Sequence, residues 1–156
     1  MQEKEELKQY LIDHLDEAIE KHYLQVYYQP VIWTLTGRLC GAEALIRWID
    51  PVKGFLSPGD FIPLFEEMNL SYKVDRYVIQ EGTQGLRGRI DKGEKLVPVS
   101  INLSRADFQM MDSLTELNQA MRKNGLHWSL VRVEITESAL SKDVAGGHSQ
   151  LPPGRL

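Results

Sequence analysis

Residues 42–48 read AEALIRW, a strand-like apolar run that contains one acid, Glu43, and one base, Arg47. Because side chains alternate across a strand, Glu43 and Arg47 share one face with Leu45, while Ala, Ile and Trp residues occupy the other. Burying a charge that has no partner is costly. The pattern therefore predicts a strand with one apolar face and one face whose charges either serve a purpose or remain solvated.

The sequence around this run predicts a β-hairpin. Residues 24–33, LQVYYQPVIW, form a second strand-like run, and the short turn TLTG separates it from RLCGAEALIRW at 38–48. Two such runs joined by a Gly-containing turn are typical of antiparallel strands. Residues 50–60, DPVKGFLSPGD, are rich in Pro and Gly and predict a loop, with a helix beginning at Ser57-Pro58.

The remainder of the chain alternates between helical and strand patterns. An amphipathic helix is predicted from about Glu3 to His22, on a stripe that includes Leu7, Leu11 and Leu15. The later predicted helices are 61–68, 71–90 and 113–126, and the later predicted strands are 97–104 and 130–138. Strands that alternate with helices indicate a parallel α/β arrangement after the hairpin.

Composition narrows the possible classes of protein. The chain has 156 residues and a net charge of −4, without a basic block, so binding to duplex nucleic acid is not expected. The sequence contains no run of roughly 18 apolar residues, so a membrane span is not expected. The charged N-terminus does not resemble a secretory signal. The single cysteine, Cys40, excludes an internal disulfide and fits a cytoplasmic location.

Polar residues recur on one face of four predicted strands. Asn102 lies on the face of strand 97–104 opposite to its apolar residues, and Glu134 lies on the corresponding face of strand 130–138. Gln29 lies on the more polar face of the first strand, 24–33. If these faces converge, carboxylate and amide oxygens would suit Mg²⁺ or Mn²⁺, and Arg47 would suit a phosphate. The alternative from spacing alone is that these residues are solvated, or that Glu43 and Arg47 pair with each other.

The ordered motifs along the chain favour a specific family. The chain resembles the EAL-domain family of cyclic di-GMP phosphodiesterases, with the signature tripeptide at Glu43-Ala44-Leu45. The supporting motifs are YYQPV, IRW, DP, SPGDFIPLFEE, SINLS and VEITESAL, and they run in family order from about Leu24 to Leu140.

The resemblance implies an α/β fold, namely a partial TIM-like (β/α) barrel of the EAL type. About four of its eight strands are expected, the first antiparallel to the others, preceded by an N-terminal helix. The implied organisation is a connector helix at 1–22, the N-terminal half of an EAL domain at 23–142, and a mobile tail outside the family pattern at 143–156.

The resemblance also assigns roles to residues. The family hydrolyses cyclic di-GMP to linear pGpG with the aid of two Mg²⁺ or Mn²⁺ ions. By motif position Glu43, Asn102 and Glu134 would be metal ligands. Arg47 would contact a substrate phosphate, and Gln29 would line the nucleotide pocket. Glu137 resembles the glutamate that anchors the loop coupling metal binding to dimerisation.

Part of the family pattern has no counterpart in these 156 residues. The Asp-Asp-Phe-Gly motif that completes the metal site and the catalytic lysine are both missing. We therefore expect a truncated EAL-domain protein that is not a competent phosphodiesterase by itself. The alternatives are a non-catalytic module that binds cyclic di-GMP or a protein partner, including a second copy of itself, and a remnant without function. The N-terminal helix also resembles the connector that joins an upstream GGDEF or sensory domain.

Overall fold

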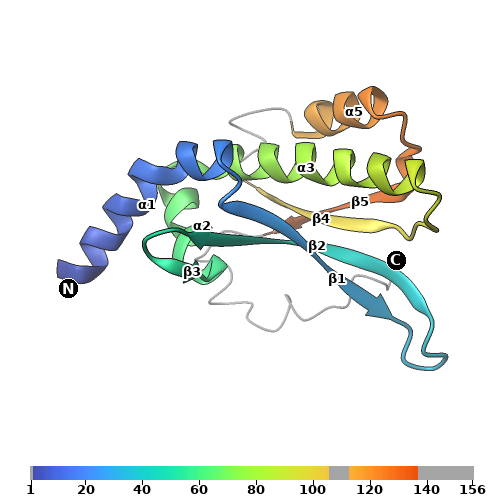
Figure 1. Cartoon of the computed structure of the whole chain (residues 1–156), viewed down its shortest axis with the longest axis horizontal. Coiled ribbons are helices and arrows are strands. Elements are labelled where there is room, and N and C mark those ends of the chain that lie inside the picture. The colour runs from blue at the N-terminus through green and yellow to red at the C-terminus, as the bar shows by residue number, and fades with distance from the viewer. Residues whose placement is uncertain (1, 106–112, 137–156) are drawn as a thin grey trace.

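Five strands and four α-helices make up the described part of the chain, residues 2–105 and 113–136 of a computed structural model (Figure 1). The helices are α1 (Gln2–Glu20), α2 (Pro58–Glu67), α3 (Ser71–Asp91) and α5 (Ser113–Lys123), with a short 3₁₀ helix η1 (Trp128–Leu130). The strands are β1 (Leu24–Ile32), β2 (Leu39–Asp50), β3 (Gly54–Leu56), β4 (Val99–Ser104) and β5 (Val131–Thr136).

The sheet has the order β1-β2-β4-β5. β1 pairs antiparallel with β2, and a turn in which the Trp33 N–H donates to the Arg38 carbonyl at 2.9 Å closes the hairpin. Gly37 in this turn has a φ of +68°, which favours glycine. β2 pairs parallel with β4, and β4 pairs parallel with β5. Both the antiparallel hairpin and the parallel α/β arrangement predicted from the sequence are confirmed.

One strand was not predicted. β3 lies within the stretch 50–60 that was expected to be a loop, and it pairs antiparallel with the end of β2. Gly54 has a φ of +74°, so the backbone can reverse there, and Phe55 then faces Ile49 in the register. A three-residue strand is too short to produce a recognisable alternation in sequence, which explains why the prediction failed.

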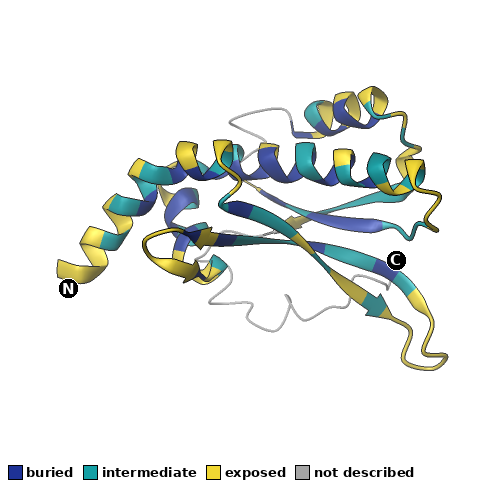
Figure 2. Ribbon diagram, in the orientation of Figure 1, coloured by how far each residue is buried: buried dark blue, intermediate teal, exposed yellow. Residues whose placement is uncertain are grey.

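Helices cover one face of the sheet, and the core lies between them. Figure 1 shows α3 running along β4, with α5 beside α3. Figure 2 shows buried residues along α3 and along β4, which lie next to each other. The strands contribute their predicted apolar faces, including the buried residues Ala44, Trp48, Val99, Ile101 and Leu103. The pattern of alternation in 42–48 therefore predicted correctly which face is inside. In β4 the predicted apolar face is also inside, but Ser100 and Ser104 on the opposite face are buried as well.

Helix α1 is docked on this core. Leu11, Leu15 and Ala18 are fully or almost fully buried, which confirms the predicted apolar stripe. The Tyr10 hydroxyl donates to Asp50 Oδ2 at 2.6 Å, so that α1 is also tied to the end of β2. Of the helices in the described residues, none combines the length and apolar character that crossing a membrane requires.

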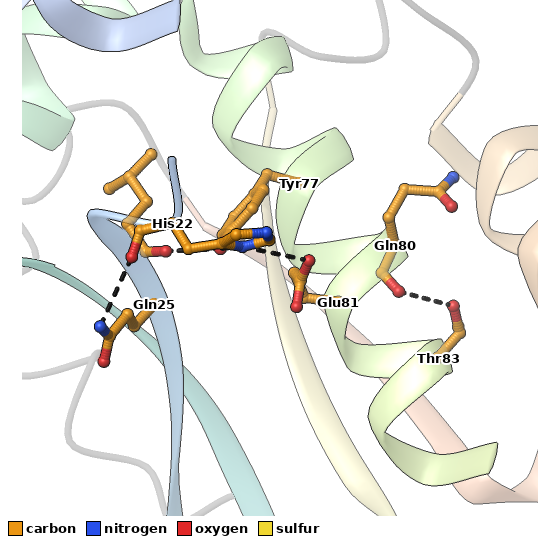
Figure 3. A network of polar contacts seen from close by, with 7 residues as sticks. His22, Gln25, Tyr77, Gln80, Glu81 and Thr83 are labelled. Atoms are coloured by element: carbon orange, nitrogen blue, oxygen red, sulfur yellow. Dashed lines mark hydrogen bonds and ion pairs between the residues drawn. The ribbon is translucent and has the colours of Figure 1, made fainter. Parts of the chain in front are cut away.

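The turn from α1 into β1 is held against α3 by polar contacts (Figure 3). His22 has a φ of 61°, an uncommon value for a non-glycine residue, and its Nδ1 lies 3.3 Å from the Tyr77 hydroxyl and 3.8 Å from Glu81 Oε1. The Tyr77 hydroxyl donates to the Leu24 carbonyl, and Gln25 Nε2 donates to the His22 carbonyl at 3.4 Å. These bonds fix the direction in which β1 leaves the helix.

Helix α2 begins at the predicted Ser57-Pro58 with a capping box. The Ser57 hydroxyl accepts from the Gly59 N–H at 3.3 Å, and the Ser57 N–H donates to Asp60 Oδ2 at 3.2 Å. We expect Ser57→Ala to lower the free energy of unfolding by about 1 kcal/mol, the usual contribution of such a cap. Thermal unfolding would measure the loss. Thr34→Ala in the exposed hairpin turn is the control, and equal stabilities of the two variants would contradict the prediction.

Candidate functional site

The registers of the sheet bring four of the candidate residues onto one face. Gln29 on β1 lies opposite Glu43 on β2, and Glu43 lies beside Ser100 on β4. Asn102, two residues further along β4, lies beside Glu134 on β5. Residues that are level across neighbouring strands, or two apart along one strand, point to the same side of a sheet. This polar face is opposite to the face that packs under α3.

A direct contact joins two of these residues. Asn102 Nδ2 donates to Glu43 Oε1 at 3.0 Å, across the β2–β4 pair. Both side chains are half-buried, as is that of Glu134. The structure therefore places an amide and two carboxylates from three neighbouring strands in one region of the polar face.

The two carboxylates affect each other electrostatically. Burial raises the pKa of Glu134 above its ordinary value, the negative charge of Glu43 raises it further, and Arg132 partly opposes both effects. A raised pKa from burial and a like charge means that the site disfavours a second negative charge as long as no cation is present. A divalent cation between these oxygens would relieve that repulsion.

Arg47 lies on the same face of β2 but does not pair with Glu43. Its Nη1 donates to the Ile46 carbonyl at 2.9 Å, and its partner in the register is Gln25. Within residues 2–105 and 113–136 no ion pair joins Glu43 to Arg47, and Glu43 is bonded to Asn102 instead. The alternative interpretation of 42–48 as a simple internal ion pair is therefore wrong.

The donors on the polar face are chemically suited to a hard divalent cation but are few. Carboxylate and amide oxygens are typical ligands of Mg²⁺ and Mn²⁺. In the described segments no group of three or more His, Cys, Asp or Glu side chains is placed to hold a metal ion. Glu43 and Glu134 with the Asn102 amide would therefore provide only part of a coordination shell. The predicted loop anchor Glu137 and the predicted tail at 143–156 lie outside the described residues.

Two further residues were given no role from sequence, Arg132 on the polar face and Asp75 on the helix-covered side of the sheet. Arg132 sits beside Ser100 in the β4–β5 register, and alternation alone would have grouped it with Glu134. Asp75 on α3 is almost fully buried, and its Oδ2 accepts from the Ser104 N–H at 2.8 Å, where β4 ends. No local pattern marks Asp75, because the contact joins a helix to a strand 29 residues later.

A comparison with known protein families identifies the family to which this chain belongs. The family model described as the EAL domain matches residues 12–146. The chain belongs to the EAL-domain family. The EAL match begins inside α1 rather than at residue 23, and the predicted division at 1–22, 23–142 and 143–156 stays a prediction.

Several known proteins are similar in sequence. The chain is 37% identical over 126 residues to the oxygen sensor protein DosP of Escherichia coli, covering 81% of this chain and 16% of that protein. It is 31% identical over 133 residues to the bifunctional diguanylate cyclase/cyclic di-GMP phosphodiesterase MucR of Pseudomonas aeruginosa, covering 85% of this chain and 19% of MucR. The chain thus spans less than a fifth of the length of these curated relatives.

Solved EAL structures share the fold. The MucR phosphodiesterase in complex with c-di-GMP superposes with a TM-score of 0.74 at 30% identity, covering 88% of this chain and 56% of that one. The FimX EAL domain of Pseudomonas aeruginosa bound to c-di-GMP gives a TM-score of 0.68 at 26% identity, with 80% and 49% coverage. These similarities confirm the predicted EAL-type α/β fold with its antiparallel first strand. The chain spans about half of each solved chain.

Proposed function

We propose that this EAL chain carries part of the site of a cyclic di-GMP phosphodiesterase, an enzyme that hydrolyses cyclic di-GMP to pGpG. The observation that carries the proposal is the Asn102–Glu43 hydrogen bond beside Glu134 on one sheet face. It is supported by the similarity to MucR, which is named as a phosphodiesterase and whose EAL structure is a c-di-GMP complex.

The proposed metal ligands are Glu43, Asn102 and Glu134, for Mg²⁺ or Mn²⁺. The support is the all-oxygen donor set and the mutual repulsion of the two half-buried carboxylates, which a cation would offset. A divalent cation bound there would supply polarisation of a phosphate oxygen. The Glu43–Asn102 hydrogen bond would hold both oxygen donors in place before the cation arrives.

Arg47 and Gln29 are the proposed contacts for the nucleotide. Arg47 donates one hydrogen bond to its own strand through Nη1. Guanidinium offers five N–H donors, so several remain for a phosphate. Gln29 is exposed and lies opposite Glu43, where an amide side chain would line the pocket next to the metal ligands. The role of Glu137 as a loop anchor belongs to the same proposal.

For the 156-residue chain itself we propose binding without efficient hydrolysis. Among the described residues the proposed metal ligands are two carboxylates and one amide, whereas the site implied by the family also uses an Asp-Asp pair and a lysine. The second candidate function, a module that only binds cyclic di-GMP or a protein partner, is favoured by the same deficit of donors. A cytoplasmic location is part of the proposal, supported by the single free thiol of Cys40. An upstream GGDEF or sensory domain fits the bifunctional MucR and the oxygen sensor DosP.

Titration of the purified chain with Mn²⁺ and with cyclic di-GMP, followed by calorimetry, tests the proposal. We expect Glu43→Gln to weaken Mn²⁺ binding by about tenfold or more, since loss of even an outer-shell partner typically costs about 10–100-fold. Glu20→Gln, an exposed position on α1, is the matched control and should change nothing. The proposed site would be contradicted if the wild-type chain bound neither Mn²⁺ nor cyclic di-GMP. It would also be contradicted if Glu43→Gln and Glu20→Gln bound equally well.

An assay of pGpG formation separates the two candidate functions. We expect binding of cyclic di-GMP without turnover by the wild-type chain. Turnover that Glu43→Gln abolishes would show that the missing aspartates and lysine are not needed, or that a second copy supplies them, and the expectation of binding alone would then be wrong.

A further inference from the structure

The tip of the β1–β2 hairpin exposes four large apolar side chains. Leu35 is 95% exposed, Ile32 53%, and Trp33 and Leu39 51% each. Figure 1 shows the hairpin projecting from the sheet, and Figure 2 shows its tip to be exposed throughout. Single exposed apolar residues are ordinary, but four on one protruding turn form an apolar patch that is characteristic of a binding surface.

Two other segments lie at the same end of the molecule as this tip. The Ala42 N–H, where the hairpin rejoins the sheet, donates to the Pro98 carbonyl at 2.9 Å, next to the α3–β4 connection. Arg89 near the end of α3 lies over the Tyr28 ring of β1 at 5.3 Å. Arg87 Nη1 donates to the Asn124 carbonyl at 3.3 Å, which brings in the end of α5. We call residues 32–42, 87–95 and 122–128 together the hairpin end.

The hairpin end is basic although the chain as a whole is acidic. It holds seven Lys and Arg and only two Asp and Glu, whereas the rest of the chain has eleven and twenty. The seven are Arg38, Arg87, Arg89, Lys92, Lys95, Arg122 and Lys123. Both acids, Asp91 and Glu94, already face arginines in exposed ion pairs. No acid occurs between residues 26 and 42, so the tip itself carries no negative side chain that would repel an anionic surface.

We propose that the hairpin end docks on the surface of an anionic lipid bilayer, with the tip of the hairpin inserted among the headgroups. An apolar protrusion with basic residues at the same end of the molecule is a combination that binds anionic membranes at their interface. Trp33 at the tip and Trp128, 77% exposed before β5, are of the residue type that favours the interfacial region. The hairpin tip protrudes as a convex surface (Figure 1). A deformable lipid bilayer can accommodate such a surface without a preformed groove, which a rigid protein partner would need.

The docking also fixes an orientation. β2, β4 and β5 are parallel and begin at the hairpin end, so their carboxyl ends point away from the bilayer. The polar face that carries Glu43 and Asn102 would then remain open to a soluble ligand. The surface inference does not depend on what that ligand is.

Flotation of the full chain with lipid vesicles tests the inference. We expect binding to anionic vesicles of phosphatidylcholine with about 30% phosphatidylglycerol. Binding to vesicles of phosphatidylcholine alone should be much weaker. Trp48 is buried, so a blue shift of tryptophan emission on binding would report on Trp33 and Trp128 at the hairpin end.

Two pairs of matched variants locate the contact. Leu35→Asp should weaken binding by about tenfold or more, whereas Val52→Asp, at a 75% exposed apolar position in the β2–β3 turn, should not. The double variant Lys92→Glu/Lys95→Glu should weaken binding by at least about tenfold. The double variant Lys4→Glu/Lys8→Glu changes the net charge equally on exposed α1 positions and should have a much smaller effect.

Three results would overturn the inference. The first is the absence of binding to phosphatidylglycerol vesicles, and the second is binding that Leu35→Asp and Lys92→Glu/Lys95→Glu leave unchanged. The third is a dimer by light scattering that Leu35→Asp dissociates, which would assign the surface to a second copy of the chain. Far-UV circular dichroism of each variant verifies that these exposed substitutions leave the fold intact.

Discussion

Replacing Trp48 by alanine is expected to lower the free energy of unfolding by about 3–5 kcal/mol, the cost of removing a large aromatic side chain from a core. Trp48 has no exposed surface. Its ring packs edge-on against Phe61 at 5.6 Å and is stacked near Phe65 at 6.3 Å between ring centroids. Its Nε1 donates to Asp50 at 3.2 Å, so the substitution removes both packing and a hydrogen bond.

Urea denaturation with the remaining tryptophans or circular dichroism as the signal would measure the loss. The chain provides its own controls, because Trp33 and Trp128 are 51% and 77% exposed. Trp33→Ala and Trp128→Ala should change the stability by no more than about 0.5 kcal/mol. If the three substitutions had similar effects, Trp48 would not be the centre of the core between α2 and the sheet.

Asp50→Asn is expected to lower the free energy of unfolding by about 2–4 kcal/mol at neutral pH, because hydrogen bonds to a buried charged group are each worth about 1.5–3 kcal/mol. Asp50 is 4% exposed and lies at the end of β2. Its carboxylate accepts from four donors, namely the Tyr10 hydroxyl, Trp48 Nε1 and the N–H groups of Val52 and Lys53. An asparagine amide presents its own N–H donors to some of these groups and so cannot satisfy all four.

The pH dependence of the free energy of unfolding distinguishes the effect of the negative charge of Asp50 from the effect of its side-chain shape. Burial alone would raise the pKa of Asp50, but its hydrogen bonds, led by the one from Tyr10, outweigh burial and hold the pKa below its ordinary value of 3.8. A lowered native pKa contributes stability that is present above the ordinary pKa and is lost as the pH falls through the native one. The deficit of Asp50→Asn should therefore shrink as the pH is lowered below about 4. A deficit that is constant between pH 7 and pH 3 would contradict the assigned role of the charge.

Tyr10→Phe removes only the hydrogen bond by which α1 contacts Asp50 and leaves the other three donors to Asp50 in place. The hydrogen bond to Asp50 raises the pKa of Tyr10 to about 12, so the hydroxyl is a donor throughout the pH range of the experiment. Removing it should cost about 1.5–3 kcal/mol, less than Asp50→Asn, which disturbs several of the four contacts and removes the charge. Equal costs for the two variants would mean that the turn after β2 contributes nothing to the stability of the cluster.

The candidate site was largely readable from strand alternation and motifs. Alternation placed Glu43 and Asn102 on polar faces, and the registers show that these faces coincide. The partner of Glu43 was not readable. Arg47 is four residues away along the same strand, whereas Asn102 is 59 residues away, yet Asn102 is the partner. The reason is that the distance between neighbouring strands is shorter than four residues along one strand.

Other features depended on contacts between distant segments and had no local signal. Asp75 reaches the end of β4 from near the start of α3, and β3 is recognisable only through its pairing with β2. The hairpin end shows the same effect for charge. Its basic residues come from three separate segments, each too short to form a basic block in sequence.

By itself, the sequence determined the helices and long strands, which face of β2 is buried, and membership of the EAL family. These properties follow from local periodicity and from ordered motifs, both of which are encoded by neighbouring residues. Only the tertiary structure decided that Glu43 bonds to Asn102, that Tyr10 donates to Asp50, and that basic residues of three segments gather at the end of the sheet from which the hairpin projects. Each of these requires the register between strands or the docking of a helix, which depends on packing across the whole chain.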